Sequence, residues 1–125
     1  MKKSLIAFIM LFFTIAVINC ERQPVAPPPE AVLLVLDTIR SGYNEQDAEL
    51  FYKDFSAIMF TKGFTKDAWF DVIKELKQKL GEWKAQKYLG EEKGAYTWRV
   101  QFDKGKTKCV IVLNEEFRVT GLWFR

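Results

Sequence analysis

Residues 95–113, AYTWRVQFDKGKTKCVIVL, decide the fold, because apolar and polar residues alternate in two runs on either side of the polar segment 103–106. This alternation predicts two antiparallel strands joined by a short turn. If Phe102 faces Thr107, one face of the hairpin is almost wholly apolar and the other is mostly polar. The positions expected to face a core are Tyr96, Trp98, Val100, Phe102, Cys109, Ile111 and Leu113. Such a hairpin packs one face on helices.

The period of two continues on both sides of this hairpin. The four expected strands are residues 83–89, 95–102, 107–113 and 118–124. Short loops between them predict an antiparallel meander. The last strand is apolar on both faces, with Val119 and Trp123 on one and Leu122 and Phe124 on the other. We therefore expect its outer face to be covered by the chain itself, a second copy or another protein.

Before Gly81 the apolar residues recur at helical spacing. We expect a first helix from Ala31 that ends at SGYN (41–44), and a second over 46–60. A third helix follows the N-cap residue Thr65 and ends at Gly81, which can adopt a left-handed conformation. The fold class predicted is α+β, with three N-terminal helices packed on the four-stranded meander in one domain, residues 31–125.

The N-terminal segment, residues 1–19, has the pattern of a signal peptide. Lys2 and Lys3 precede an uncharged run whose strongly apolar part, 5–18, spans about 21 Å as a helix, which is short of the roughly 30 Å needed to cross a bilayer. The run ends in Val-Ile-Asn-Cys, which resembles the lipobox of bacterial lipoproteins, with Asn19 at a position where that family usually has Gly, Ala or Ser. The resemblance implies cleavage before Cys20 and attachment of acyl chains to it; the alternative is an uncleaved helix with an incidental cysteine.

A Pro-rich linker follows the predicted lipid attachment site, over residues 20–30. Four of the ten residues after Cys20 are Pro, which predicts an extended spacer of up to about 30 Å that holds the domain off the bilayer. The resemblance implies a lipid-anchored protein of the bacterial envelope. Residue 21 is Glu and not the Asp that signals inner-membrane retention in enteric bacteria, so the outer membrane is favoured in a Gram-negative cell.

Composition excludes several classes of function. The chain has no His, which excludes a Ser-His-Asp triad and any His-bearing metal site, and no cofactor or metal is expected. Removing Lys2 and Lys3 from the 19 basic residues leaves 17 against 16 acidic ones, so the mature chain carries only +1 and lacks the charge of a nucleic-acid binder. Gly105-Lys106-Thr107 imitates the end of a P-loop, but Val100 stands where the first glycine is required.

The order of helices and strands resembles the nuclear transport factor 2-like superfamily. The segment from Lys79 to Phe124 is similar to uncharacterised bacterial members, in which a helix ends at Leu-Gly, an aromatic residue such as Trp83 opens the sheet, and a Val-x-Gly-Leu strand, here 119–122, closes the chain. The resemblance implies a cone-shaped fold with a pocket between the bent sheet and a helix. The residues expected to line that pocket are Tyr43, Phe55, Trp69, Tyr96, Trp98, Phe102, Ile111 and Trp123.

Three functions are compatible with this sequence. The first is a non-catalytic module that binds a small apolar ligand or another envelope protein, which the aromatic content favours. The second is an isomerase- or hydratase-like enzyme in which Tyr43 or Tyr96 works with a desolvated Asp37 or Asp54. The third is a structural homodimerisation module. Cys109 is expected to be a small core residue.

Overall fold

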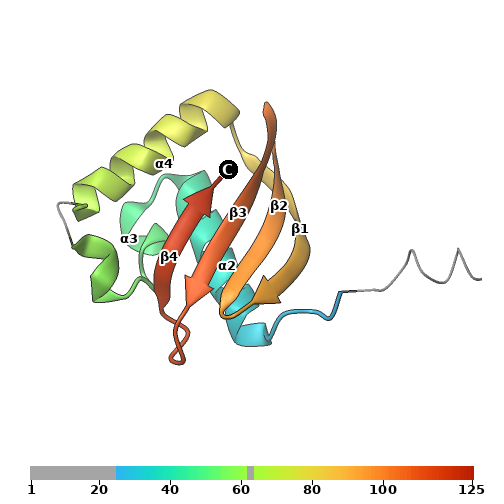
Figure 1. The fold of residues 1–125 in the computed structure, drawn as a ribbon. Helices are drawn as coiled ribbons and strands as arrows, with labels where there is room; N and C mark the ends of the chain where they lie inside the picture. Colours follow the sequence, from blue (N-terminus) through green and yellow to red (C-terminus); the bar gives the residue numbers. More distant parts are fainter. Residues whose placement is uncertain (1–24, 62–63) are drawn as a thin grey trace, which may run out of the picture.

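The computed structural model of the chain describes residues 25–61 and 64–125. The predicted signal peptide at 1–19 and Cys20 lie outside these residues. The described elements form an α+β fold in which helices precede one antiparallel sheet of order β1-β2-β3-β4 (Figure 1). The strands are β1 Trp83–Glu92, β2 Ala95–Phe102, β3 Gly105–Leu113 and β4 Val119–Phe124. The predicted meander is confirmed, and β1 and β4 are its edges.

The register of the central hairpin differs from the predicted one by two residues. Phe102 faces Gly105 and not Thr107, so the turn has two residues, Asp103 and Lys104, in place of four. The turn is tied to the end of the last helix, since the Lys104 N–H donates to the Leu80 carbonyl at 2.9 Å. A shift by an even number leaves each side chain on its predicted face. The inward positions of β2 and β3 are accordingly buried or half-buried.

The predicted faces of β4 are wrong at its first residue. The register is shifted between Val112 and Leu113, so that Val119 faces Leu113 and Gly121 faces Val112. Thr120 is the additional residue of this β-bulge, and it places Val119 on the core face, away from Trp123. Only Trp123 of the pair lies on the outer face. Further register shifts in β1, at Lys84 and Leu89, bend the opposite edge of the sheet.

The first helix, α2 (Glu30–Glu45), continues through the SGYN segment that we expected to end it. Gly42 is buried inside it because the next helix, α3 (Ala48–Phe51), lies against this point. A Cβ atom at Gly42 would lie 2.3 Å from the main-chain nitrogen of Phe51. The glycine therefore permits a close approach of two helices and does not act as a helix breaker.

The predicted second helix over 46–60 is wrong. Helical structure stops after α3 and resumes only as a short 3₁₀ helix, η1 (Ala57–Phe60). The residues between them pair with the sheet: the Ser56 N–H donates to the Val119 carbonyl and the Val119 N–H donates to the Asp54 carbonyl, both at 2.8 Å. Pairing with the start of β4 therefore replaces the helix that the apolar spacing predicted.

The last helix, α4 (Lys66–Leu80), agrees with its prediction. The Thr65 hydroxyl accepts a hydrogen bond from the Ala68 N–H at 3.2 Å, as an N-cap should. Gly81 ends the helix with φ of +81°, although its ψ of −154° is not that of the left-handed helical region. Its missing side chain leaves room for Asp103, whose carboxylate accepts a hydrogen bond from the Glu82 N–H at 3.0 Å. This bond holds the pKa of Asp103 below its usual range.

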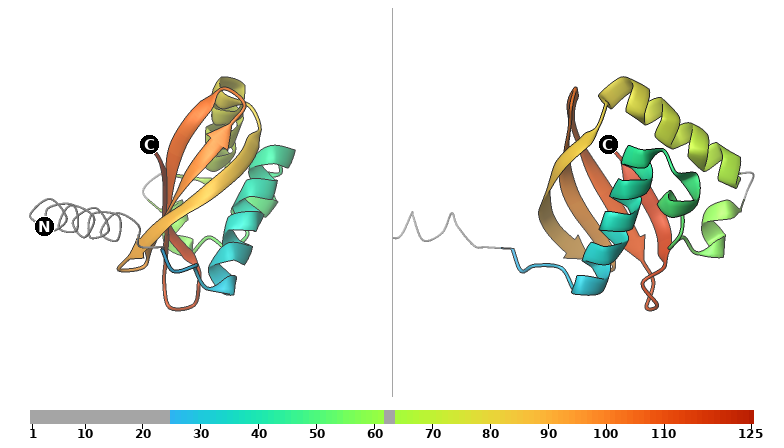
Figure 2. Two further views of the ribbon diagram at one scale, coloured as in Figure 1. Left: turned by 90° about the vertical axis from the view of Figure 1, so that its right-hand side faces the viewer. Right: turned by 180° about the vertical axis from the view of Figure 1, so that it is seen from behind.

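The hydrophobic core lies between the helices and one face of the sheet, called the inner face. Figure 1 shows α2 behind the sheet, and α4 on the side of β4. Figure 1, which looks onto the opposite, outer face, and the side view in Figure 2 (left) show no described helix over that face. The aromatic residues thus lie in two places. Some are in the interior beside α2, and the others are where α4 meets β4.

Candidate functional site

Six of the eight residues predicted to line a pocket are buried in the core. They are Tyr43, Phe55, Trp69, Trp98, Phe102 and Ile111. Beside α2, the ring of Tyr43 lies 6.1 Å from that of Trp83 and 5.4 Å from that of Phe102, measured between centroids. Trp83 and Phe102 are themselves 5.8 Å apart. Side chains therefore fill this part of the interior.

Tyr43 has a structural hydrogen bond and lacks a partner for acid-base chemistry. Its hydroxyl donates to the Gly81 carbonyl at 2.8 Å. Burial, with smaller contributions from Asp103 and Glu82, raises the pKa of Tyr43 to about 12. Within residues 25–61 and 64–125 no charged side chain is buried, so neither Asp37 nor Asp54 supplies the desolvated carboxylate that the enzyme alternative requires.

The seam between α2 and β1 is closed by polar contacts. The Asn44 side chain donates to the Trp83 carbonyl at 3.1 Å and accepts from the Trp83 N–H at 2.9 Å. Arg40 donates to the Lys84 carbonyl at 2.8 Å and to the Gln86 side chain at 3.1 Å. These bonds fix the helix to the main chain of the strand, and they leave the apolar residues below without access to solvent.

The boundary between α4 and β4 is open by comparison. Two adjoining hollows of about 380 and 620 Å³ lie along β4, and Phe64, Trp69, Leu122 and Trp123 line both. The first continues along α4 to Val72 and Leu76, and the second continues to Ile58, Met59 and Gly121. We call these hollows together the β4 groove. Of the predicted pocket residues, Trp69 and Trp123 therefore do line a cavity, although it lies between α4 and β4 and not between the sheet and α2.

The aromatic side chains of the β4 groove are held in place although several are exposed. Trp69 is fixed by a hydrogen bond from its ring nitrogen to the Met59 carbonyl at 3.0 Å. Phe55 and Phe64 pack edge-on against it, with centroids 5.0 and 4.7 Å away. Phe64 is 40% exposed, Ile58 60% and Trp123 49%. The groove is thus a fixed apolar surface that the described residues leave in contact with solvent.

The main chain of β4 adds polar groups to this groove. Lys108 and Arg125 exchange both main-chain hydrogen bonds, at 2.9 and 2.8 Å. Because such pairs alternate along an antiparallel ladder, the N–H and C=O groups of Leu122 and Phe124 point away from β3. In the described part of the chain, no hydrogen bond joins these groups to α4 or η1. The groove therefore combines apolar walls with the unpaired edge of a sheet.

Sequence reasoning missed most of the groove. Val72 and Leu76 were recognisable as part of the apolar stripe of the last helix, and Phe64 as an aromatic residue in a predicted loop. Nothing in the sequence shows that α4 stands far enough from β4 to leave Val72 and Leu76 only half-buried, because that separation is set by tertiary packing.

Cys109 and Tyr96 complete the predicted residues. Cys109 is fully buried, as predicted, and burial raises the pKa of its thiol to about 12. Tyr96 is half-buried and stacks on Trp98 with centroids 6.3 Å apart. It lines a hollow of about 410 Å³ together with linker residues Val25 to Pro29, at the edge formed by β1.

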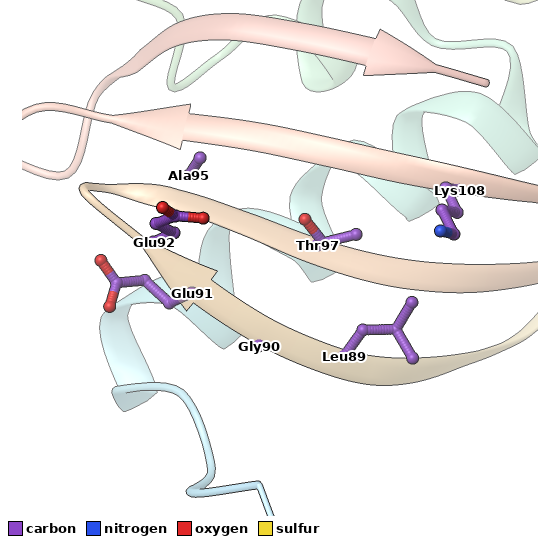
Figure 3. A pocket seen from close by; sticks show the side chains of 7 residues that line it. All are labelled: Leu89, Gly90, Glu91, Glu92, Ala95, Thr97 and Lys108. Atoms are coloured by element: carbon purple, nitrogen blue, oxygen red, sulfur yellow. The ribbon is translucent and has the colours of Figure 1, made fainter.

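The outer face of the sheet has a different character from the β4 groove. A shallow hollow of about 440 Å³ crosses β1, β2 and β3, with Glu92 near one end and Lys108 near the other (Figure 3). The bulge residue Leu89 and Thr97 lie between them. This surface is therefore open and mixed in polarity, with Leu89 and Ala95 among its lining residues, in contrast to the mainly apolar β4 groove.

Comparison of the chain with protein-family models, curated proteins and solved structures gave no match. In the described residues, no helix combines the length and apolar character needed to span a membrane.

Proposed function

We propose that this chain is a lipid-anchored protein of the bacterial envelope whose domain is a non-catalytic binding module, and that the β4 groove binds an extended apolar segment of another envelope protein. One observation carries the proposal: exposed aromatic residues line the groove along a sheet edge whose Leu122 and Phe124 main-chain groups have no partner in the described chain. An added strand would satisfy those groups, and its alternate side chains would enter the hollows.

The groove favours an extended peptide over the two other occupants that the sequence allows. A small apolar ligand would contact Trp69 and Trp123 but leave the main-chain groups of β4 unpaired. A second whole copy would have to bring its own α4 and η1 beside those that already flank the edge. A peptide strand about 4.8 Å from β4 meets neither difficulty.

The anchor and the cone shape remain parts of the proposal. The lipobox-like residues Val17 to Cys20 support acylation at Cys20, and Glu21 supports an outer-membrane location in a Gram-negative cell. The order of helices and meander, together with the β-bulges that bend β1 and β4, supports a nuclear transport factor 2-like cone. Because Tyr43 and Phe102 fill the interior beside α2, we place binding at β4.

The test uses a matched pair of substitutions at Phe124. Peptides selected by display on the detergent-solubilised full chain are measured against Phe124→Pro and Phe124→Ala. Both variants lose the ring, but only proline removes the outward N–H, and a proline there leaves the ladder to β3 intact. We expect the proline variant to bind at least about tenfold more weakly than the alanine variant, since a charge-neutral hydrogen bond and a steric block separate them.

Equal affinities for the two variants would contradict strand addition and favour a small ligand or side-chain docking alone. Sedimentation of the same full chain in detergent separates the remaining alternative. A dimer that the proline variant dissociates and the alanine variant preserves would show that the edge serves a second copy.

A further inference from the structure

Four cations lie side by side across the outer face of the sheet, one on each strand or at its end. Lys87 faces Arg99, and Arg99 faces Lys108. Lys108 in turn exchanges two main-chain hydrogen bonds with Arg125. All four residues are exposed. We call them the cationic row.

Among the described residues, no side-chain carboxylate forms an ion pair with the cationic row. Lys106 lies on the same face, two residues along β3, whereas the acidic residues that line the hollow on this face, Glu91 and Glu92, are at the far end of β1. The ion pairs of the described residues join Lys77 with Glu82, Lys79 with Glu75 and Lys84 with Asp103, so none involves the row. Like charges directly opposite one another destabilise a sheet. The mature chain carries only +1 overall, so this concentration of cations is a property of one face.

The linker brings this sheet close to the predicted anchor. Val25 to Pro29 lie beside Tyr88, Gly90 and Tyr96 at the end of β1, and Val25 would be 4.0 Å from a Cβ atom at Gly90. Figure 2 shows the linker passing the end of β1 before it enters α2. Only five peptide units separate Val25 from Cys20, which is at most about 18 Å of chain. About half of the predicted spacer, Val25 to Pro29, therefore lies beside the β1 edge, although all of these residues except Pro28 are exposed. An acylated Cys20 would keep the β1 edge within that distance of the bilayer.

We infer that the outer face docks on an anionic lipid leaflet through the cationic row. Arg99 and Arg125 can each bind a phosphate in bidentate geometry, and Lys87 and Lys108 add point charges. Trp123, on the same face beside Val110, has the amphipathic ring that favours the headgroup region. Bringing the lipid phosphates to the row offsets the repulsion between its members. This inference rests on the proposed function for the anchor, but not for the β4 groove.

Trp123 provides the readout. Trp69, Trp83 and Trp98 are buried, whereas Trp123 is 49% exposed. The full chain, purified from membranes, is reconstituted into vesicles of phosphatidylcholine alone or with phosphatidylglycerol, and aqueous acrylamide is used to quench its fluorescence. A Trp123→Phe variant supplies the signal of the buried residues for subtraction. We expect quenching of Trp123 to fall about twofold or more in the anionic vesicles, and to recover as salt shortens the screening length from about 10 Å to 3 Å.

Two triple variants separate the row from net charge. Neutralising Lys87, Arg99 and Lys108 to Gln should abolish the difference between the vesicles. Neutralising Lys53, Lys66 and Lys74, which lie at exposed positions on the helical side, removes the same charge and should preserve it. Equal quenching in both vesicles for the wild type would overturn the inference. Loss of protection on adding millimolar inorganic phosphate would also overturn it, because the row would then be a small-anion site.

The intact mass of the same preparation reports on the anchor independently. If the protein is acylated and quenching is equal in the two kinds of vesicle, the proposed anchor is supported and docking of the outer face is overturned. If the protein is unacylated and Trp123 is still protected in anionic vesicles, docking of the outer face is supported and the lipid anchor is overturned. In that case the apolar segment 5–18 would hold the chain in the bilayer.

Discussion

The domain closes its two sides in different ways. At the α2–β1 seam, Asn44 bonds both main-chain groups of Trp83, and the rings of Tyr43 and Phe102 fill the space behind. At the α4–β4 boundary, no hydrogen bond crosses between the two described elements, and apolar residues such as Leu76 remain half-buried. Similar side chains therefore serve as core on one side and as accessible surface on the other. The two sides also differ in hydrogen bonding, because side chains of α2 bond the main chain of β1 only at the closed seam.

The largest expected effect tests whether the closed seam carries the stability. Trp83→Ala removes a ring that is 1% exposed and packs on Tyr43 and Phe102, so we expect a loss of about 3–5 kcal/mol in the free energy of unfolding. Trp123→Ala, at 49% exposure, should cost about 1 kcal/mol or less. Urea unfolding of the full chain in detergent measures both. Similar losses in the two variants would contradict the distinction between the sides.

A second prediction concerns the polar closure itself. Asn44→Ala leaves the Trp83 N–H and C=O without their partner and should cost about 1–3 kcal/mol. Asn44→Asp keeps an acceptor for the N–H but loses the donor to the carbonyl, so its stability should lie between those of alanine and wild type. If both variants match the wild type in urea unfolding, hydrogen bonds do not close this seam.

The sequence could predict the closed side better than the open one. Alternation fixed the faces of Trp98 and Ile111, and an even register shift left those faces unchanged. The face of Val119 could not be predicted, because the bulge at Thr120 depends on how β4 meets residues 54–56. The pairing of residues 54–56 with Val119 also explains why the helix predicted over 46–60 does not form. The separation of α4 from β4 at the groove could not be predicted, because the spacing of apolar residues within one element carries no information on its distance from another element.

Alkaline pH should weaken the closed interior selectively. The folded pKa values of Cys109 and Tyr43 are both about 12, above their usual values of 9.0 and 10.0. The unfolded chain therefore releases these protons first, and stability present below pH 9 is lost as pH rises toward 12. Urea unfolding at a series of pH values measures this loss of stability. In Cys109→Ala the loss that begins near pH 9 should be absent, and in Tyr43→Phe the loss that begins near pH 10 should be absent. A wild-type stability that is flat from pH 9 to 11 would contradict this prediction.

The smallest expected effect bears most directly on whether the α4 side has room. Leu76 lies one turn from Ile73 on the same helix, but Ile73 is fully buried and Leu76 lines the groove. Enlarging a side chain in a closed core costs about 1–3 kcal/mol, because neighbours must move. Ile73→Phe should show that cost, whereas Leu76→Phe should change the free energy of unfolding by less than about 0.5 kcal/mol, since the added atoms enter a hollow of about 380 Å³. Equal costs at the two positions, measured by urea unfolding, would show that the groove closes in solution and is unavailable to a partner.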